Sequence, residues 1–487
     1  MAIAKVFTKP KTIYAVLLLG IFTFLFLGSE YLYVNMIALT AGKEKTVIMQ
    51  NYALGVSSIG TFLYPLFHRL FKGRARGVGL IAAALAAAVC NLLVQKNVSY
   101  SFTLFSAMAL FLFLGLLGGA VHYLFFRLAE DRDHIARMVG ISYALGIILQ
   151  FLNNNLVKHE IAEAVILSFS ALAASVLLLK ADKLCCAQTA KAEAMPLHAK
   201  KESGKAYRKN IAAGGLLALL VILMACIFST LDNAVTMRHV TDTDIGQWPR
   251  LLLAVSGIIA GFLFDIRNRK YMTIMMYCVL LMSVICVVIL KMGGSFLIGL
   301  IVFYLSSGFF FVFFTTGFLG FARHTQMPAL WAGMGRAMNN VSAALFTNVS
   351  VVLLVSDSNG MLAIILTLVL FVVISVVLSL YTALMPAESA AAEDIHAAPD
   401  PQEAFRILSE KFALTPREAE VFEKLINSEE SIQEIADSLY LSRRTCQRYI
   451  SSIYESAGVK SRMGLYQLYI KTQLSLNPTS RHEDKGD

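Results

Sequence analysis

Twelve long apolar runs fill the first 385 residues, and they constrain the fold more than any other feature of the chain. They cover about 13–39, 47–68, 77–95, 102–126, 138–157, 161–180, 211–233, 248–265, 271–290, 295–320, 330–355 and 360–385. An α-helix needs about 20 apolar residues to cross the hydrocarbon layer of a bilayer, which is the length of most of these runs. Since 57% of the residues are hydrophobic and 15% are charged, the composition is typical of an integral membrane protein. We predict an all-α polytopic membrane helix bundle with twelve transmembrane helices.

The first apolar run has the basic flank of a secretory signal but not its length. It follows Lys5, Lys9 and Lys11 and continues for far longer than the apolar core of a signal peptide. No convincing small-residue cleavage site follows it. We therefore expect a retained transmembrane helix.

The Lys and Arg residues separate clearly between the two sets of connections. One set, together with the N-terminus, carries 22 of them, eight within 180–209, whereas the other set carries seven. Connections rich in Lys and Arg stay in the cytoplasm. The sequence thus predicts a multi-pass protein of the cytoplasmic cell membrane with both termini in the cytoplasm.

A different kind of sequence begins at Leu414. Two helix starts carry capping-box signals, Thr415 with Glu418 and Ser431 with Glu434, and the second opens a short helix predicted to end near Leu439. A tight turn and a third helix follow. This order predicts a helix-turn-helix.

The third helix, Ser442–Ala457, has the layout of a DNA-reading helix. Gly458 ends it, and its N-terminal turns are basic and polar while its other face is apolar. From Ser438 to Thr472 the chain carries six Lys and Arg against one acid, whereas 386–437 is acidic. We predict that it binds double-stranded DNA through Ser442, Arg443, Arg444, Thr445, Gln447, Arg448, Lys460 and Arg462. The alternative is a helical bundle that binds protein.

These residues resemble the LuxR-type (GerE-like) helix-turn-helix domain. The resemblance covers about 60 residues through LTPRE from Leu414, EIADSL-x-LS from Glu434 and GV-x-SR from Gly458. It implies a small four-helix domain whose third helix reads the major groove and whose fourth, from Ser461, is available for dimer contacts. Cys446 and Tyr449 replace the family's usual valine and histidine, and the usual basic residues near the helix end are absent.

The membrane part divides into two sets of six helices at its longest polar break, which favours two similar halves. The predicted organisation is membrane helices 1–6 over 1–180, a cytoplasmic loop over 181–210, membrane helices 7–12 over 211–385, a linker over 386–403, the helix-turn-helix domain over 404–475 and a disordered tail over 476–487. The linker is rich in Ala, Pro and acids.

One connection in the second half resembles the signature of the major facilitator superfamily. Gly261, Asp265, Arg269 and Lys270 match that motif, while Asn268 replaces a glycine. In the first half the corresponding stretch keeps only its basic residues, with His68 in place of the acid. The resemblance implies a gate between open states, on the cytoplasmic face, and a transporter-like fold for about 385 residues.

Polar groups within membrane spans are costly and indicate function. Glu30 and Asp232 occupy corresponding places in the first and seventh helices, which suggests a central cavity lined by two acids. The predicted cavity residues are Glu30, His122, Gln150, Asn154, Asp232, Arg336 and Asn340. Two alternatives remain: the acids could lie at the outer interface, and Arg336 could extend to the cytoplasmic surface. For Phe309–Phe314 we expect packing or lipid contact rather than ligand binding.

No catalytic constellation is evident. The seven cysteines are scattered without metal-ligand or disulfide spacing, and no phosphate-binding glycine loop is found. We expect neither an enzyme nor a metal or cofactor. No receiver domain precedes the helix-turn-helix, so the membrane part is the expected input.

The sequence therefore predicts a membrane-embedded transcriptional regulator of a bacterium. Its transporter-like part would sense an unknown small molecule, and its cytoplasmic domain would bind promoter DNA as a homodimer. One alternative is an active secondary transporter with an appended regulatory DNA-binding domain. Another is a structural tether between DNA and the membrane.

Overall fold

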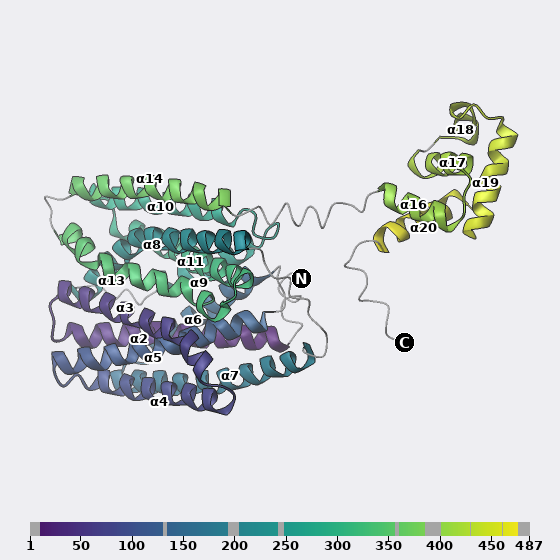
Figure 1. The fold of residues 1–487 in the computed structure, drawn as a ribbon. Coiled ribbons are helices and arrows are strands. Elements are labelled where there is room, and N and C mark those ends of the chain that lie inside the picture. The colour runs from purple at the N-terminus through teal and green to yellow at the C-terminus, as the bar shows by residue number, and fades with distance from the viewer. Residues whose placement is uncertain are drawn as a thin grey trace. The chain divides into compact units, whose positions relative to one another are not determined.

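A computed structural model describes residues 10–129, 134–192, 204–241, 248–355, 360–384, 401–428, 430–459 and 461–475. The chain forms two compact units, Met1–Pro386 and Ala387–Asp487, which we treat separately (Figure 1). The predicted tail at 476–487 and most of the predicted linker, 386–400, lie outside the described residues.

Each apolar run predicted from the sequence forms a helix in the first unit. The six helices of the first half are α2 (Pro10–Ala38), α3 (Lys43–Leu70), α4 (Arg74–Lys96), α5 (Tyr100–Leu128), α6 (Ile135–Leu156) and α7 (Glu160–Ala192). Those of the second half are α8 (Gly204–Thr241), α9 (Leu251–Phe264), α10 (Met272–Lys291), α11 (Phe296–Phe321), α13 (Met334–Val355) and α14 (Gly360–Leu384). Three short helices connect them: η1 (Trp248–Arg250), η2 (Ala322–His324) and α12 (Pro328–Trp331).

Ten helices of the described residues are long and apolar enough to cross a membrane. The apolar helix through η1 and α9 is shorter, and α3 is not among the ten. Helix α3 is too polar on average to be counted with the ten because it has a buried polar face, which includes Gln50, Asn51 and Ser57. That face contacts other helices, so its polar groups find partners inside the protein.

The predicted cytoplasmic loop at 181–210 is in part helical. Helix α7 continues to Ala192 and α8 already begins at Gly204, so only 193–203 fall outside the described residues. At 1.5 Å per residue, a helix as long as α7 extends for roughly 50 Å, well beyond a hydrocarbon layer of about 30 Å. The basic stretch between the halves therefore begins and ends as helix.

The two halves meet along two helix pairs, α3 with α13 and α6 with α9. Glycines allow the second pair to approach closely. A Cβ atom at Gly140 would lie 2.3 Å from the carbonyl oxygen of Gly257, and one at Gly261 would lie 2.7 Å from that of Ala136. Any larger residue there would force the backbones apart, so Gly261 of the gate motif has a packing role.

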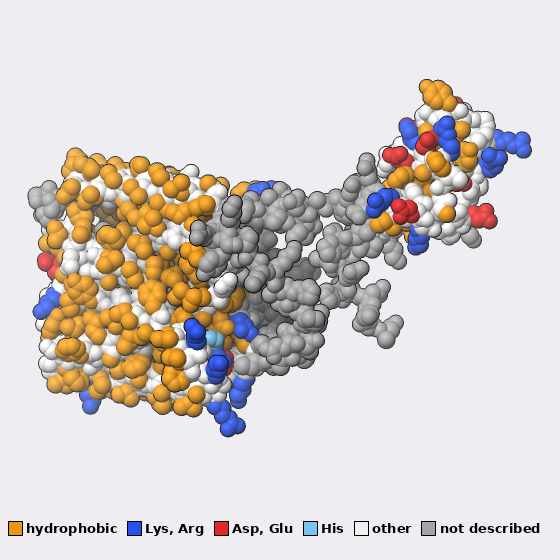
Figure 2. Space-filling model, viewed as in Figure 1, with side chains coloured by type: hydrophobic (Ala, Val, Ile, Leu, Met, Phe, Trp, Pro, Cys, Tyr) orange, Lys and Arg blue, Asp and Glu red, His pale blue; other side chains and the backbone are white. Residues whose placement is uncertain are grey.

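Hydrophobic side chains cover most of the visible face of the first unit (Figure 2). Large apolar residues such as Phe105 and Phe169 are 73% and 67% exposed. In water this surface would be unfavourable, whereas lipid solvates it without penalty. The first unit is therefore a multi-pass membrane domain.

The second unit is a small helical domain with its own apolar core. It contains α16 (Pro401–Lys411), α17 (Pro416–Asn427), α18 (Ile432–Ser438), α19 (Arg443–Ala457) and α20 (Arg462–Ser475). Helix α16 precedes the four predicted helices and packs on α20. Phe422, Ile435 and Ile453 are fully buried in the core.

The local helix signals of this domain are confirmed. Both capping boxes form, at Thr415 with Glu418 and at Ser431 with Glu434. Gly458 ends α19 in the left-handed conformation, with φ of 67°. These contacts connect residues only three or four positions apart, which is why the sequence predicts them well.

Candidate ligand cavity and DNA-binding surface

A cavity of ≈ 200 Å³ lies inside the membrane domain and is lined by both halves. Helices α2, α3 and α6 supply one side, and α8, η1, α9, α11 and α13 supply the other. The lining includes Phe26, Glu30, Gln50, Asn51, Tyr143, Phe228, Asp232, Arg250, Tyr304, Phe310, Phe311, Phe314, Arg336, Asn339 and Asn340. The cavity therefore lies between the two halves of the membrane domain, the place where transporter-like folds hold their ligand sites.

Four of the seven predicted cavity residues line this space: Glu30, Asp232, Arg336 and Asn340. They come from three helices, and Asn340 donates from Nδ2 to the Ser57 hydroxyl across the two halves at 2.9 Å. The acids therefore face a cavity of the protein.

The other three predicted cavity residues are not in the lining. The Nδ1 atom of His122 lies 2.7 Å from the Gly118 carbonyl oxygen, one turn earlier in its own helix. Gln150 donates to the Leu27 carbonyl oxygen at 2.9 Å and so joins α6 to α2. Asn154 lies further along α6 and contributes nothing to the cavity wall. Which polar residues line the cavity depends on how each helix is rotated and packed, and the sequence alone does not give this.

Four charged side chains line the cavity: Glu30, Asp232, Arg250 and Arg336. Among the described residues, no ion pair within 4 Å joins any of them. Glu30 accepts a hydrogen bond from Gln50 at 2.7 Å. Charges held apart in a membrane protein mark a functional site, because each has lost water without gaining a directly bonded counter-ion.

Aromatic rings hold the two arginines. The guanidinium carbon of Arg336 lies 4.5 Å from the ring centre of Phe26 and 5.3 Å from that of Phe311, and Arg250 lies 5.8 Å from the ring of Tyr31. Such cation–π contacts stabilise a positive charge without neutralising it. Arg336 is therefore held inside the bundle and does not extend to the surface.

The phenylalanine run on α11 has a role that the sequence analysis missed. Phe310, Phe311 and Phe314 line the cavity. Phe310 stacks on Phe228 with centroids 4.4 Å apart, and Phe311 stacks on Tyr143 at 4.1 Å. Packing was expected, but three of these rings also form cavity wall.

Polar contacts on α3 tie the halves together beside the cavity. Asn51 donates from Nδ2 to Asn233 at 2.8 Å and to Thr347 at 3.0 Å. Ser58 donates to the Ala337 carbonyl oxygen at 3.0 Å. The recurring polar residues of α3, spaced about two turns apart, were the sequence signal that could have indicated this interface.

The gate motif closes one end of the α6–α9 contact. The two carboxylate oxygens of Asp265 accept hydrogen bonds from the backbone N–H groups of Ala136 and Arg137, at 3.1 and 2.9 Å. These N–H groups belong to the first turn of α6, which has no helical acceptors for them and carries a partial positive charge. The Nε atom of Arg137 also lies 3.7 Å from the Asp265 carboxylate. Arg269 ends a turn of three left-handed residues, 267–269, and Lys270 follows it.

The corresponding region of the first half has a different arrangement. Arg76 donates two hydrogen bonds to Asp182 of α7, at 2.6 and 2.8 Å, and its Nη1 lies 3.2 Å from Nδ1 of His68. The acid missing from the motif at His68 is thus supplied by Asp182, within the same half. Of the two motif positions, only Asp265 crosses between the halves.

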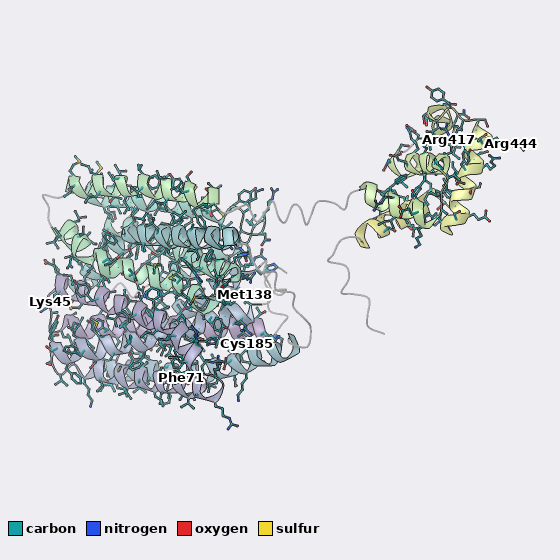
Figure 3. All side chains as sticks on the ribbon, viewed as in Figure 1. Lys45, Phe71, Met138, Cys185, Arg417 and Arg444 are labelled. Carbon is teal, nitrogen blue, oxygen red and sulfur yellow. The ribbon has the colours of Figure 1, made fainter. Side chains whose placement is uncertain are left out.

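Helix α19 of the small domain has one buried and one exposed face. Cys446, Ile450 and Ile453 are buried, whereas the predicted DNA-contact residues Arg443, Arg444, Gln447 and Arg448 are exposed. Arg444 projects away from the other helices of the domain (Figure 3). A shallow groove on this face is lined by Ser442, Arg444, Thr445, Gln447, Arg448 and Ser451.

The start of α19 is fixed by its cap. Ser442 accepts a hydrogen bond from the backbone N–H of Thr445 at 3.1 Å, and the two hydroxyls lie 2.7 Å apart. Before the cap, Tyr440 occupies the left-handed region with φ of 55° and is 98% exposed. The turn therefore sets the direction of the recognition helix through backbone geometry and not through packing of Tyr440.

Glu418 connects α17 to α19. Its carboxylate accepts a hydrogen bond from the Ser452 hydroxyl at 2.6 Å and one from the backbone N–H of Thr415 at 2.9 Å. The Ser452 bond first, and then those from Thr415, hold the pKa of Glu418 below its usual value. Arg417, beside it, lines a second hollow together with Arg448, and sequence reasoning did not single it out.

Two of the predicted DNA-contact residues, Lys460 and Arg462, are not found on the exposed face of α19. Lys460 lies outside the described residues. The Arg462 guanidinium donates to the carbonyl oxygen of Leu425, in the last turn of α17, and to those of Ser428 and Glu430, which follow it. These donors satisfy the end of a helix, so the structure gives Arg462 a role inside the domain and we leave it out of the DNA surface.

Residues 413–469 match the model of the luxR family of bacterial regulatory proteins. This domain therefore carries a LuxR-type helix-turn-helix, which implies DNA binding. No curated protein sequence matches the chain.

Several solved transporters resemble the membrane domain. The human organic anion transporter MFSD10 (TETRAN) is 13% identical with a TM-score of 0.53, and the match covers 76% of this chain and all of that one. The E. coli fucose:proton symporter FucP is 12% identical with a TM-score of 0.47, covering 77% of this chain and 99% of that one. Another FucP structure, described as a major facilitator superfamily transporter in the outward conformation, is 13% identical with a TM-score of 0.47, covering 76% and 99%. At these identities the likeness shows the fold alone: the N-terminal region is an MFS-like helix bundle.

The structural role of Arg462 and the exposed, DNA-facing position of Arg444 can be tested by comparing how each arginine affects stability. Arg462→Ala should lower the free energy of unfolding of the small domain by about 2–3 kcal/mol, because three carbonyl groups lose a charged donor. Arg444→Ala should change it by less than about 0.5 kcal/mol, because the side chain is exposed. Urea unfolding followed by circular dichroism measures both, and equal effects would contradict the structural role of Arg462.

Proposed function

We propose that this chain, an MFS-like membrane domain joined to a LuxR-type DNA-binding domain, is a membrane-embedded transcriptional regulator that senses a small molecule. One observation carries the proposal: a charged cavity between two membrane halves and an exposed recognition helix occur in the same polypeptide. Neither family is enzymatic, and together they supply an input and an output.

The output is binding of promoter DNA by α19. The major groove admits a helix, and Arg443, Arg444 and Arg448 lie on the exposed face, where they can reach phosphates and base edges. Met463 and Tyr466 of α20 are 65% and 44% exposed, an apolar surface suited to a second copy. We infer a homodimer on DNA, since two linked domains gain effective concentration on neighbouring half-sites.

The input is a ligand in the cavity. A transporter-like fold has at least two arrangements of its halves, and a ligand shifts their populations only by its differential affinity. The cavity walls come from both halves, so the affinity of a ligand that contacts both walls depends on how far apart the halves are.

The cavity acids also support a second candidate function. Glu30 and Asp232 line the cavity, where proton- or cation-coupled transport would need them. An active secondary transporter with an appended regulatory domain is therefore the alternative. Uptake of the ligand by vesicles that contain only residues 1–386 would favour it, and binding without uptake would favour the sensor.

Both termini are proposed to be cytoplasmic. The excess of Lys and Arg on one set of connections supports this orientation, and DNA is accessible only on that side.

The DNA surface can be tested with duplexes that the purified protein selects from a random pool. Replacing Arg443, Arg444 or Arg448 with Ala should weaken binding by about 1–3 kcal/mol and reduce the dependence of affinity on salt. Arg406→Ala is a matched control, because this arginine of α16 is exposed and pairs with Glu410. Affinity is measured by fluorescence anisotropy. If the variant with all three arginines replaced binds as tightly as the unchanged protein, α19 is not the DNA-binding helix.

The gate can be tested in cells with a reporter that carries a selected site. Asp265→Asn should change reporter output by about tenfold, because it removes roughly 1–2 kcal/mol of helix-terminus interaction that links the halves. The DNA affinity of the purified variant should stay unchanged. Glu44→Gln, an exposed acid at the start of α3, is the control. Unaltered output at normal membrane levels would mean that this contact is not the switch.

Topology can be tested with alkaline phosphatase, which is active only outside the cytoplasm. An insertion after Asn97, between α4 and α5, should be active, and a fusion after Leu384 should be silent. The reverse pattern would overturn the proposed orientation.

A further inference from the structure

We propose that the cavity binds a small aromatic zwitterion, a molecule with one ammonium group, one carboxylate and one aromatic ring, about as large as a single amino acid. This inference rests on the proposed sensor function and adds the chemistry of its ligand.

The balance of charge in the cavity favours a ligand without net charge. Two acids, Glu30 and Asp232, face two bases, Arg250 and Arg336. Asp232 has no hydrogen bond or ion pair within the described part of the chain. A purely cationic or anionic ligand would leave one sign in excess in a low-dielectric site. A zwitterion gives both signs a partner.

The spacing of the charges fits ammonium and carboxylate groups that lie close together. Arg336 lies over the ring of Phe26, and Glu30 follows Phe26 by four residues on α2. The backbone positions of Phe26 and Glu30 are about one helical turn, roughly 5.4 Å, apart along α2, so Arg336 contacts the turn next to the one that carries Glu30. An α-amino acid carries both charged groups on one carbon atom, so it can bridge them, with its carboxylate on the planar guanidinium and its ammonium group on Glu30.

The acids of the two halves belong to one electrostatic environment. Asp232 lines the same cavity as Glu30 and Arg250. An ammonium group between Glu30 on α2 and Asp232 on α8 would relieve the repulsion of two like charges. Because these helices belong to different halves, the same ligand group would draw the halves together.

The remaining wall suits an aromatic ring. The stacked pairs Phe228 with Phe310 and Tyr143 with Phe311 bring rings from both halves to the cavity, and Phe314 lies one turn further along α11. A ligand ring can add edge or offset contacts to such faces, which an aliphatic side chain cannot match.

The size of the cavity limits the ligand. Its volume of ≈ 200 Å³ falls below the roughly 300–1,000 Å³ of pockets that hold drug-sized molecules. A single amino acid fits this size, whereas a peptide or a drug-like compound does not.

Four probes test the proposal on the full chain in lipid nanodiscs, with binding measured by calorimetry. L-phenylalanine carries all three features. 2-Phenylethylamine lacks the carboxylate, 3-phenylpropanoate lacks the ammonium group and L-leucine lacks the ring. L-phenylalanine should bind at least about tenfold more tightly than each analogue, since an unpaired buried charge or a lost ring contact costs at least that much. An analogue that binds as tightly, or the failure of all four probes, would overturn the proposal.

Two variants assign the charged contacts. Arg336→Gln should remove the advantage of L-phenylalanine over 2-phenylethylamine. Glu30→Gln should remove its advantage over 3-phenylpropanoate. Glu44→Gln, outside the cavity, should keep both preferences. If Arg336→Gln does not fold, Arg336→Lys retains the charge and should weaken binding without reversing the preference. Preferences that survive both cavity variants would contradict the assigned contacts.

Failure of this proposal is distinguishable from failure of the proposed function. If none of the four probes binds but selected duplexes bind and Asp265→Asn still changes reporter output, only the ligand class is wrong. If the chain binds no duplex, the regulator proposal itself fails whatever the cavity binds.

Discussion

The absence of water around the membrane helices is the constraint on which this structure depends. Hydrocarbon offers no hydrogen-bond partner, so the backbone must be helical and polar side chains must face the protein interior. Helix α3 shows the consequence. It is not among the ten described helices that are long and apolar enough to cross a membrane, and its polar face instead bonds to α8 and α13 through contacts such as those of Asn51 with Asn233 and Thr347. The same constraint places Glu30, Asp232 and Arg336 in a cavity between the halves.

The contact between the halves is asymmetric. Asp265 caps the end of α9 and accepts hydrogen bonds from two first-turn N–H groups of α6. The equivalent position of the first half, His68, takes part in a cluster with Arg76 and Asp182 that stays within its own half. The carboxylate of Asp265 therefore joins α9 to the start of α6 across the two halves. An interaction of a charged group with a helix terminus contributes only about 0.3–2 kcal/mol, so breaking this contact has a limited energetic cost.

In the small domain, stability and recognition use different residues. Capping boxes, the Glu418–Ser452 hydrogen bond and the Arg462 guanidinium secure the helices, while Arg443, Arg444 and Arg448 stay exposed. Basic residues near a recognition helix are thus not equivalent. Each must be judged by whether its donors are already used inside the protein.

The sequence by itself determined most features that depend on neighbouring residues, although it did not predict α16 or the helical continuation of α7 and α8 into the loop at 181–210. Apolar runs predicted the membrane helices because hydrophobicity is local, and capping residues predicted the helix ends of the DNA-binding domain because caps join residues three apart. The exposed face of α19 followed from helical periodicity. Four of the seven predicted cavity residues line the cavity, and two of these, Glu30 and Asp232, were paired in the sequence by their equivalent positions in the two halves.

Only the tertiary structure decided which distant side chains meet. Nothing local distinguishes Asn340, which lines the cavity, from Gln150, which bonds to Leu27, because helical phase and packing select between them. The cavity role of the phenylalanines on α11 and the structural role of Arg462 likewise depend on elements far away in the chain. Contacts between residues separated by tens or hundreds of positions form only when whole helices pack, and their partners cannot be read from either segment alone.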